Sequence, residues 1–282
     1  MRGLCFCGGG IKASAHIGAL KAFEEEGLKF DCVSGASSGS IIATMYALGY
    51  NSDEMWKMFQ EFAPKIKYYQ WKQILKFIGG LIFKRTITID GLNSGKVVEK
   101  IIKDICSMNE IYNINQIEMP LLISMVNMQT GSVYIASSKE IRTTFSDKTK
   151  YITDIPLEKA VRASCSYPVV FCPCEYYGMQ LIDGGIRENL PWKSLKQIGT
   201  DEIWGIEFNT ITKKGDCCSN IIDVASRALE LQGRELSIYE KQGIDKLITI
   251  NMKKVSLLDS TQTEYLYKIG YEQAKQQIKK YS

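Results

Sequence analysis

The stretch Cys32-Val33-Ser34-Gly35-Ala36-Ser37-Ser38-Gly39, with the small and apolar residues 40–48 behind it, decides the fold of this chain. Cys32–Ser34 predicts a short buried strand, and Ser38–Leu48 predicts a helix. The turn between them has the form Gly-X-Ser-X-Gly, and a strand-to-helix turn is the context that a nucleophile elbow requires. A helix N-terminus would also stabilise an alkoxide developing on Ser37. The alternative is a Ser/Gly turn that only caps a helix.

A second glycine-rich turn lies near the start of the chain. Leu4–Cys7 predicts a strand and Ser14–Glu26 a helix, with Gly8-Gly9-Gly10-Ile11-Lys12-Ala13 between them. This turn matches a dinucleotide fingerprint, with Asp31 about 20 residues further on. However, Asp31 precedes its strand, whereas the acidic residue of a dinucleotide site ends one. Besides a dinucleotide site, two other interpretations of this turn remain. One is a tight turn that needs glycine, and the other is a row of backbone N–H groups that holds an oxyanion beside Lys12.

Strands and helices alternate along the rest of the chain. Further strands are predicted at 120–127, 132–136, 179–182, 202–208 and 246–251, and further helices at 53–62, 94–106, 157–163, 221–241 and 261–280. This alternation predicts an α/β fold with a mainly parallel sheet covered on both faces. The turn Gln129-Thr130-Gly131 predicts a hairpin. Because no linker or composition break divides the chain, we expect a single domain over residues 1–282.

The base that would activate Ser37 is not a histidine. The only histidine, His16, precedes Ser37 and lies inside the first predicted helix, whereas an α/β-hydrolase triad places it after the serine. The candidate is Asp183, which follows the strand Met179–Ile182 and precedes two glycines. Burial would raise the pKa of this carboxyl group, so that it could accept the proton of Ser37. The alternative is an Asx turn at Asp183.

Composition excludes several other classes of protein. The net charge is only +4 and the basic residues are mostly lysine, so we expect no nucleic-acid partner. With nine cysteines, no Cys-X-X-Cys pair and one histidine, we expect free thiols and no metal site. Cys5 and Cys7 should share one face of a strand, as should Cys172 and Cys174.

The longest apolar run, Phe77–Phe83, is too short to cross a membrane and no signal peptide is visible, which predicts a cytoplasmic protein.

Taken together, these segments resemble the patatin-like phospholipases, which include bacterial lipid acyl hydrolases. The resemblance covers about residues 4–196, and its segments follow the order of the family: Gly8–Lys12, Ala15–Leu20, Gly35–Gly39, Ala163–Pro168, Asp183–Gly185 and Asn189–Pro191. It implies a three-layer α/β/α fold, with Ser37 as nucleophile and Asp183 as general base. It also implies the remaining site residues, namely an oxyanion hole of Gly8, Gly9, Gly10 and Lys12 and two turns shaped by Gly35, Gly39, Gly184 and Gly185.

The resemblance further implies hydrolysis of phospholipid or acylglycerol esters, of the phospholipase A type, without a metal or organic cofactor. Lys12 stands where the family commonly has Arg, Ala13 where it usually has Gly, and Cys7 where plant members carry an acid. None of these departures touches Ser37 or Asp183. The alternatives are an acyltransferase that uses the same acyl-enzyme, a non-catalytic lipid-binding module and a nucleotide-binding α/β domain.

Residues 65–85 combine positive charge with apolar side chains. The charged residues are Lys65, Lys67, Lys72, Lys76, Lys84 and Arg85, and no acidic residue lies among them. At helical spacing, Trp71, Ile74, Leu75, Ile78 and Ile82 share one face, and Gly79-Gly80 should weaken the helix. The prediction is a lipid-facing cap over Ser37 that docks on anionic membranes, which would make the protein peripheral to them. The alternative is a helix whose apolar face packs on the core.

Overall fold

The computed structural model describes residues 1–86, 89–141, 148–211, 218 and 221–281. The strands are β1 (Arg2–Phe6), β2 (Cys32–Ala36), β3 (Leu121–Asn127), β4 (Val133–Ser137), β5 (Thr149–Ile152), β6 (Cys174–Tyr176), β7 (Met179–Asp183), β8 (Glu202–Ile211) and β9 (Lys246–Lys253). The helices are α1 (Ala13–Glu25), α2 (Ser38–Ala47), α3 (Ser52–Phe62), α4 (Trp71–Gly79), α5 (Lys96–Met108), α6 (Leu157–Ser164), α7 (Trp192–Gln197), α8 (Ile221–Glu240) and α9 (Thr263–Ile278).

In the described residues the strands form one sheet in the order β5-β4-β3-β2-β1-β8-β9, with β7 paired to β3 and β6 to β7. The pairs from β3 through β2, β1 and β8 to β9 are parallel, so these strands end at the same edge of the sheet. The pairs β3–β4, β3–β7 and β6–β7 are antiparallel. The sheet is therefore mixed but mostly parallel, which confirms the fold class predicted from the sequence.

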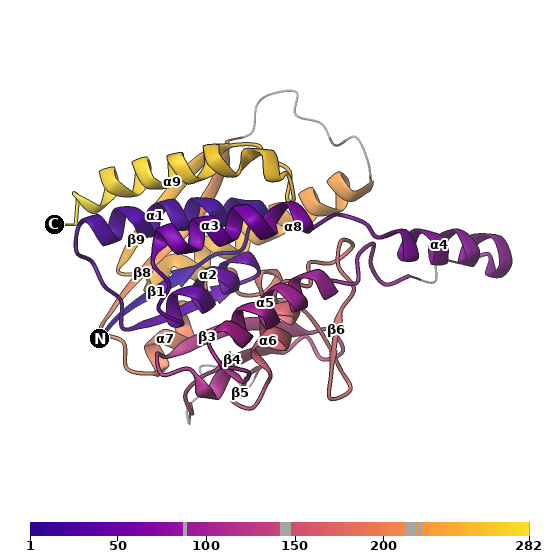
Figure 1. Ribbon diagram of the computed structural model, residues 1–282, viewed down its shortest axis with the longest axis horizontal. Coiled ribbons are helices and arrows are strands. Elements are labelled where there is room, and N and C mark those ends of the chain that lie inside the picture. The colour runs from indigo at the N-terminus through magenta and orange to yellow at the C-terminus, as the bar shows by residue number, and fades with distance from the viewer. Residues whose placement is uncertain (87–88, 142–147, 212–217, 219–220, 282) are drawn as a thin grey trace.

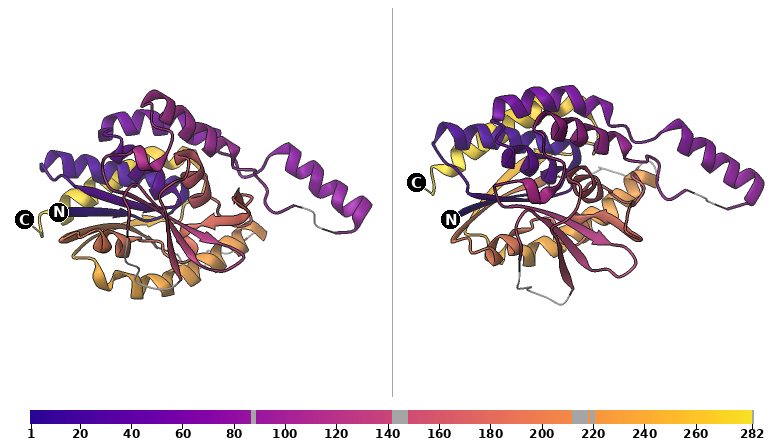
Figure 2. Two further views of the ribbon diagram at one scale, coloured as in Figure 1. Left: turned by 90° about the horizontal axis from the view of Figure 1, so that it is seen from below. Right: turned by 60° about the horizontal axis from the view of Figure 1, so that its bottom comes forward.

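Helices cover both faces of this sheet, as Figures 1 and 2 show. α1, α2, α3, α5, α6 and α9 pack on one face, and α7 and α8 lie on the other. Leu4 and Phe6 of β1 face the first layer, while Cys5 and Cys7 face the second together with Cys32. Parallel strands buried on both faces need apolar residues at successive positions, and β1 has them. The shared face of Cys5 and Cys7 is confirmed, and the described cysteines are free thiols.

Most predicted elements are present within one to three residues of their expected bounds. The hairpin is confirmed: β3 and β4 pair across the Gln129–Gly131 turn, where Gly131 has a φ of 68° and its N–H donates to the Asn127 carbonyl. The sequence did not predict β5, β6 or α7. These elements are short, and a few residues carry too little periodicity to stand out from loop sequence.

α4 projects from the body of the molecule as an arm (Figures 1 and 2). Trp71, Leu75 and Ile78 on its predicted apolar face are exposed, so the alternative that this face packs on the core is wrong. The helix changes character at the glycine pair, because α4 ends at Gly79 and Gly80–Lys84 forms one wider π-helical turn. The predicted cap over Ser37 is therefore wrong for α4, because the helix projects outward and none of its residues lines the cavities that border Ser37.

Candidate active site

Ser37 lies in the tight turn between β2 and α2. Its φ of 51° and ψ of −132° are unusual for a residue with a side chain, and they are typical of a strained turn that presents one group. The turn is possible because two glycines bring backbones close together. A Cβ on Gly35 would lie 2.4 Å from the Gly39 carbonyl oxygen, and a Cβ on Gly39 would lie 2.5 Å from the Phe6 carbonyl oxygen. The Gly-X-Ser-X-Gly pattern therefore reflects packing of the turn against β1.

A buried serine from α6 holds the backbone of this turn. Ser164 Oγ accepts a hydrogen bond from the Ser37 N–H at 2.9 Å and donates one to the Ser124 carbonyl of β3 at 2.6 Å. On the other side of the turn, Ser40 Oγ donates to the Ser37 carbonyl at 2.6 Å. The sequence alone predicts no role for Ser164, although this residue lies in the Ala163–Pro168 segment that carries part of the resemblance.

The sheet register brings Asp183 to the same edge as Ser37. Ala36 of β2 pairs with Ser124 of β3, and the next residue of β3, Met125, pairs with Asp183 of β7. Both Ser37 and Asp183 line one cavity. Two segments that lie far apart in the sequence thus meet because β7 runs antiparallel along β3.

Asp183 is almost completely buried. Its Oδ1 accepts the Gly185 N–H at 2.8 Å, whereas its Oδ2 has no hydrogen-bond partner among the described residues. Burial raises the pKa of Asp183 to about 7, while the nearby Ser37 hydroxyl and the Gly185 N–H lower it. A carboxyl group with this pKa can take up and release a proton near neutral pH.

The glycine loop lies directly against Ser37. A Cβ on Gly8 would lie 2.7 Å from the Cβ of Ser37, and the Gly8 N–H donates to Asn189 Oδ1 at 2.9 Å. The N–H groups of Gly9 and Gly10 donate to no described residue. Gly10 has a φ of 60°, and a Cβ there would lie 2.2 Å from the Leu257 carbonyl oxygen. The loop is thus a backbone turn fixed by Asn189, with two N–H groups left over at the start of a helix.

Two of the departures from the family pattern are accommodated in this loop. Ala13 has a φ of −54°, so its side chain causes no strain where the family usually has glycine. Lys12 Nζ donates to Thr210 Oγ1 of β8 at 3.0 Å, which places its charge on the wall of the cavity that also contains Ser37 and Asp183. Of the four residues expected to form an oxyanion hole, Gly8 and Lys12 therefore bind other protein groups, while Gly9 and Gly10 leave their N–H groups available.

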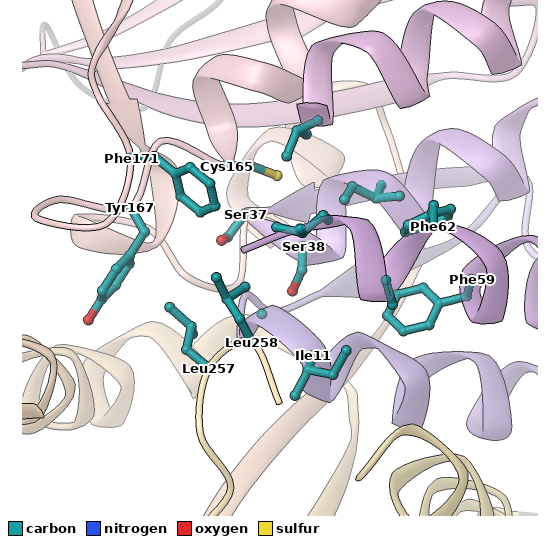
Figure 3. A pocket seen from close by; sticks show the side chains of 15 residues that line it. Ile11, Ser37, Ser38, Phe59, Phe62, Cys165, Tyr167, Phe171, Leu257 and Leu258 are labelled. Carbon is teal, nitrogen blue, oxygen red and sulfur yellow. The ribbon is translucent and has the colours of Figure 1, made fainter. Parts of the chain in front are cut away.

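Ser37 borders two cavities of different character. The first is apolar and holds about 580 Å³ of empty space, mouth included. Figure 3 shows its walls around Ser37 and Ser38, with Phe59 and Phe62 on one side and Phe171 and Leu257 on the other. The second is larger, at about 1480 Å³ with its mouth included, and about half of its lining is polar, so we call it the polar cavity. Its charged lining residues are Lys12, Asp183, Glu207, Asp223, Arg227, Glu230 and Lys254.

His16 and Asp31 take no part in this site. His16 is buried between Phe6 and Phe208, with Nε2 2.8 Å from the Cys7 carbonyl oxygen. Burial lowers the pKa of His16 to about 3, so its ring is neutral. Asp31 accepts the Arg2 N–H at the opposite edge of the sheet from the glycine loop. A dinucleotide bound at the glycine loop would therefore not reach Asp31. In the described part of the chain, no three His, Cys, Asp or Glu side chains gather as they would to hold a metal ion.

The fold resembles that of a solved bacterial protein. VipD from Legionella pneumophila superposes with a TM-score of 0.54 at 17% sequence identity, over 99% of this chain and 67% of that one. At this identity the similarity shows the fold alone.

Related sequences come from viruses, bacteria and fungi. The chain is 29% identical over 299 residues to uncharacterized protein R571 of Acanthamoeba polyphaga mimivirus, covering 99% of this chain and 94% of that protein. It is 28% identical over 202 residues to uncharacterized protein YqhO of Bacillus subtilis, covering 66% of this chain and 64% of that one. It is 23% identical over 296 residues to lysophospholipase NTE1 of Meyerozyma guilliermondii, covering 95% of this chain but only 18% of that protein.

The sequence profile that describes the patatin-like phospholipases matches residues 4–196. This range begins at β1 and includes the glycine loop, the turn at Ser37 and the strand that ends at Asp183. Because the match spans more than half of the chain, the chain belongs to the patatin-like phospholipase family.

Proposed function

We propose that this protein hydrolyses lipid esters with Ser37 as nucleophile and Asp183 as general base. Family membership supports a lipid-hydrolysing enzyme. The observation that carries the finer proposal is the pairing of a strained, cavity-lining serine with a buried carboxyl group, one oxygen of which has no partner among the residues that the structure describes. A buried polar atom without a hydrogen bond is costly, and a catalytic role gives a reason for it.

The proposed reaction proceeds in two steps. Ser37 Oγ attacks the ester carbonyl carbon while its proton passes to Asp183 Oδ2, and the tetrahedral intermediate then collapses. The bond from the carbonyl carbon to the alcohol oxygen breaks, and the alcohol leaves with the proton from Asp183. Water next attacks the acyl-enzyme while Asp183 again accepts the proton. The bond from the acyl carbon to Ser37 Oγ then breaks, Asp183 returns the proton to Ser37 Oγ, and the fatty acid is released. A base with a pKa of about 7 suits both proton transfers.

We place the oxyanion on the N–H groups of Gly9 and Gly10. Both lie in the loop that touches Ser37, and neither donates to another described residue. They are close to the N-terminus of α1, whose dipole favours negative charge. One such donor typically lowers a barrier by about 3 kcal/mol. In this scheme Asn189 holds the loop in place through Gly8, and Lys12 contributes positive charge to the cavity.

The two cavities support a substrate that is apolar at one end and polar at the other. The apolar cavity suits a fatty acyl chain, and the polar one has room for a glycerol backbone with its headgroup. Ser37 lies where the two meet, as the ester bond would. Phospholipids and acylglycerols both have this shape, so we propose them as the substrate classes.

The test measures hydrolysis of a short-chain nitrophenyl ester by Ser37→Ala and Asp183→Asn. We expect each change to reduce kcat on the order of 10⁴-fold, and the double variant to lose little more, because the two residues act as a unit. A fluorophosphonate should label the wild type at Ser37 alone. The matched controls are Ser107→Ala on the exposed end of α5 and Asp31→Asn at the opposite sheet edge, which should retain full activity.

Two outcomes would contradict parts of this proposal. If Asp183→Asn retained activity, the base would be another group. If incubation with phospholipid and a second lipid alcohol gave mainly a new ester instead of free fatty acid, the enzyme would be a transacylase that uses the same acyl-enzyme.

A further inference from the structure

The arm formed by α4 and the turn Gly80–Lys84 exposes an unusual amount of apolar surface. The large apolar residues that face solvent on or next to it are Tyr69, Trp71, Leu75, Ile78, Leu81, Ile82 and Phe83. Trp71 is 72% exposed and Phe83 85%, although side chains of this kind are normally buried. A contiguous exposed patch of this type usually marks a surface that binds a partner or a membrane.

The segment that carries the apolar patch has basic but no acidic residues. Between Glu61 and Asp90 the sequence contains no acidic residue, while Lys65, Lys67, Lys72, Lys76, Lys84 and Arg85 lie in that interval. Lys65 is paired with Glu61 at 2.9 Å, and Lys67 and Lys72 are exposed to solvent. Aromatic and aliphatic groups that alternate with cations match the boundary between headgroups and acyl chains of an anionic bilayer.

The base of the arm is attached firmly to the body. The Gln70 N–H donates to the Leu92 carbonyl at 2.9 Å, and Gln70 Oε1 accepts from Ser94 Oγ at 2.9 Å. One turn further on, Gln73 Nε2 donates to Cys172 Sγ at 3.4 Å. These bonds give the arm a defined direction relative to the sheet, so that contact at its tip would orient the whole molecule.

The arm begins beside the two cavities that meet at Ser37. Ile66 lines the apolar cavity and Tyr68 lines the polar one, both just ahead of α4. Tyr68 Oη accepts the Leu258 N–H at 3.2 Å, and the neighbouring Leu257 carbonyl accepts the Ile11 N–H of the glycine loop at 2.8 Å. A surface that held the arm would therefore lie close to the entrance used by a lipid substrate.

We propose that this arm docks the protein on anionic lipid bilayers by inserting the apolar face of α4 between the lipids while its lysines contact the anionic headgroups. The charge pattern selects this occupant over a second copy of the chain, because two identical arms would place their positive charges side by side. In the described ranges, no helix combines the length and apolar character needed to cross a membrane, so the arm would lie in the interface. The purpose of docking rests on the proposed function, but docking itself does not require Ser37.

The experiment is vesicle co-sedimentation with the Ser37→Ala protein, so that lipid is not consumed. Binding should be strong to phosphatidylcholine mixed with phosphatidylglycerol, weak to phosphatidylcholine alone, and reduced by salt. We expect Leu75→Glu to abolish binding and Lys72→Ala to lower the partition coefficient about fivefold. The matched controls are Met108→Glu, an equally exposed apolar residue at the end of α5, and Lys279→Ala after α9, neither of which should affect binding.

Further measurements separate this proposal from the catalytic one. The arm variants in the wild-type background should hydrolyse a water-soluble nitrophenyl ester at the normal rate. Equal binding to neutral vesicles at high salt, no binding to either vesicle, or normal binding by Leu75→Glu would overturn the docking proposal. So would a dimer in lipid-free solution that Leu75→Glu dissociates. Vesicle binding that depends on the arm, in a wild-type protein inert to fluorophosphonate, would support docking and overturn the proposed hydrolase.

Discussion

At the scale of single residues, the candidate site depends on the cost of burying one carboxyl group. Asp183 Oδ2 has no hydrogen-bond partner in the described part of the chain, and burial raises the pKa of Asp183 to about 7 from its ordinary value near 3.8. This shift makes the group a better base, but it also means that the ionised form is poorly solvated in the folded protein. Burial of Asp183 would therefore be the common cause of its strength as a base and of a loss of stability in the folded protein.

We expect kcat/KM for a neutral ester to rise with pH and to level off above about pH 7, because in the proposed mechanism only ionised Asp183 accepts the proton of Ser37. The profile is measured by assaying ester hydrolysis at a series of pH values, with each reaction stopped at fixed times. A profile that stays flat down to about pH 5 would assign the base to a group with an ordinary carboxyl pKa.

The same shift predicts how stability changes with pH. Between about pH 4 and 7 the folded protein holds a proton on Asp183 that the unfolded chain has lost, so stability falls as pH rises through this window. Above pH 7 the full penalty, on the order of 4 kcal/mol, is present. Asp183→Asn should therefore raise the melting temperature at pH 8 and change it little at about pH 3, where wild-type Asp183 is mostly neutral in both states.

At the scale of secondary-structure elements, three segments hold the turn at Ser37. β2 delivers the chain to the turn, α2 continues it, and Ser164 at the end of α6 ties its N–H to β3. Such a tie is needed because a φ of 51° with a side chain is costly and persists only when the surroundings enforce it. We therefore assign Ser164 a positioning role.

Ser164→Ala should slow labelling of Ser37 by a fluorophosphonate at least about tenfold while lowering stability by about 1–3 kcal/mol, since the Ser37 N–H loses its acceptor. Ser138 provides a matched control. Its Oγ likewise accepts a backbone N–H, from Leu121 at 2.9 Å, and donates to a backbone carbonyl, of Met119 at 2.9 Å, but at another place in the sheet. Ser138→Ala should cost similar stability and leave labelling unchanged. Equal labelling by both variants would reduce Ser164 to a structural residue.

At the scale of the whole molecule, the separation of an apolar from a polar cavity organises the proposed function. The apolar cavity lies between α2, α3 and α5 and the loop that contains Leu257 and Leu258, so helices from one layer of the fold shape it. The polar cavity extends toward α8 on the other layer. Ser37 is at their junction because it directly follows β2, a central strand of the sheet that separates the two layers.

Filling the apolar cavity should shorten the preferred acyl chain. Ala63 lines it between α3 and α4, and Ala63→Leu adds three carbons there. Because each buried methylene is worth about 0.8 kcal/mol, we expect kcat/KM for a decanoyl ester to fall roughly tenfold or more relative to a butyryl ester. The butyryl ester is the internal control for folding and chemistry. An unchanged ratio would place the acyl chain elsewhere.

The sequence by itself predicted the α/β fold class, the hairpin after β3, the turn at Ser37 and Asp183 as the candidate carboxylate. These features depend on short-range patterns. Glycines are required where an added Cβ would lie about 2.5 Å from another backbone atom, and strands buried on both faces have to be apolar at successive positions. Each such constraint fixes residue types within a few positions of one another, so it is visible in the sequence even where the contact itself is to a distant strand.

Only the tertiary structure decided which distant groups meet. Asn189 occupies the Gly8 N–H and Thr210 binds Lys12, which leaves Gly9 and Gly10 as the available donors of the loop. The register of β7 on β3 places Asp183 at the same sheet edge as Ser37. The sequence pattern of α4 was compatible with burial and with exposure alike, and contacts at Gln70 and Gln73 direct it outward. Long-range pairing depends on the packing of the entire chain, and no local pattern of residues contains that information.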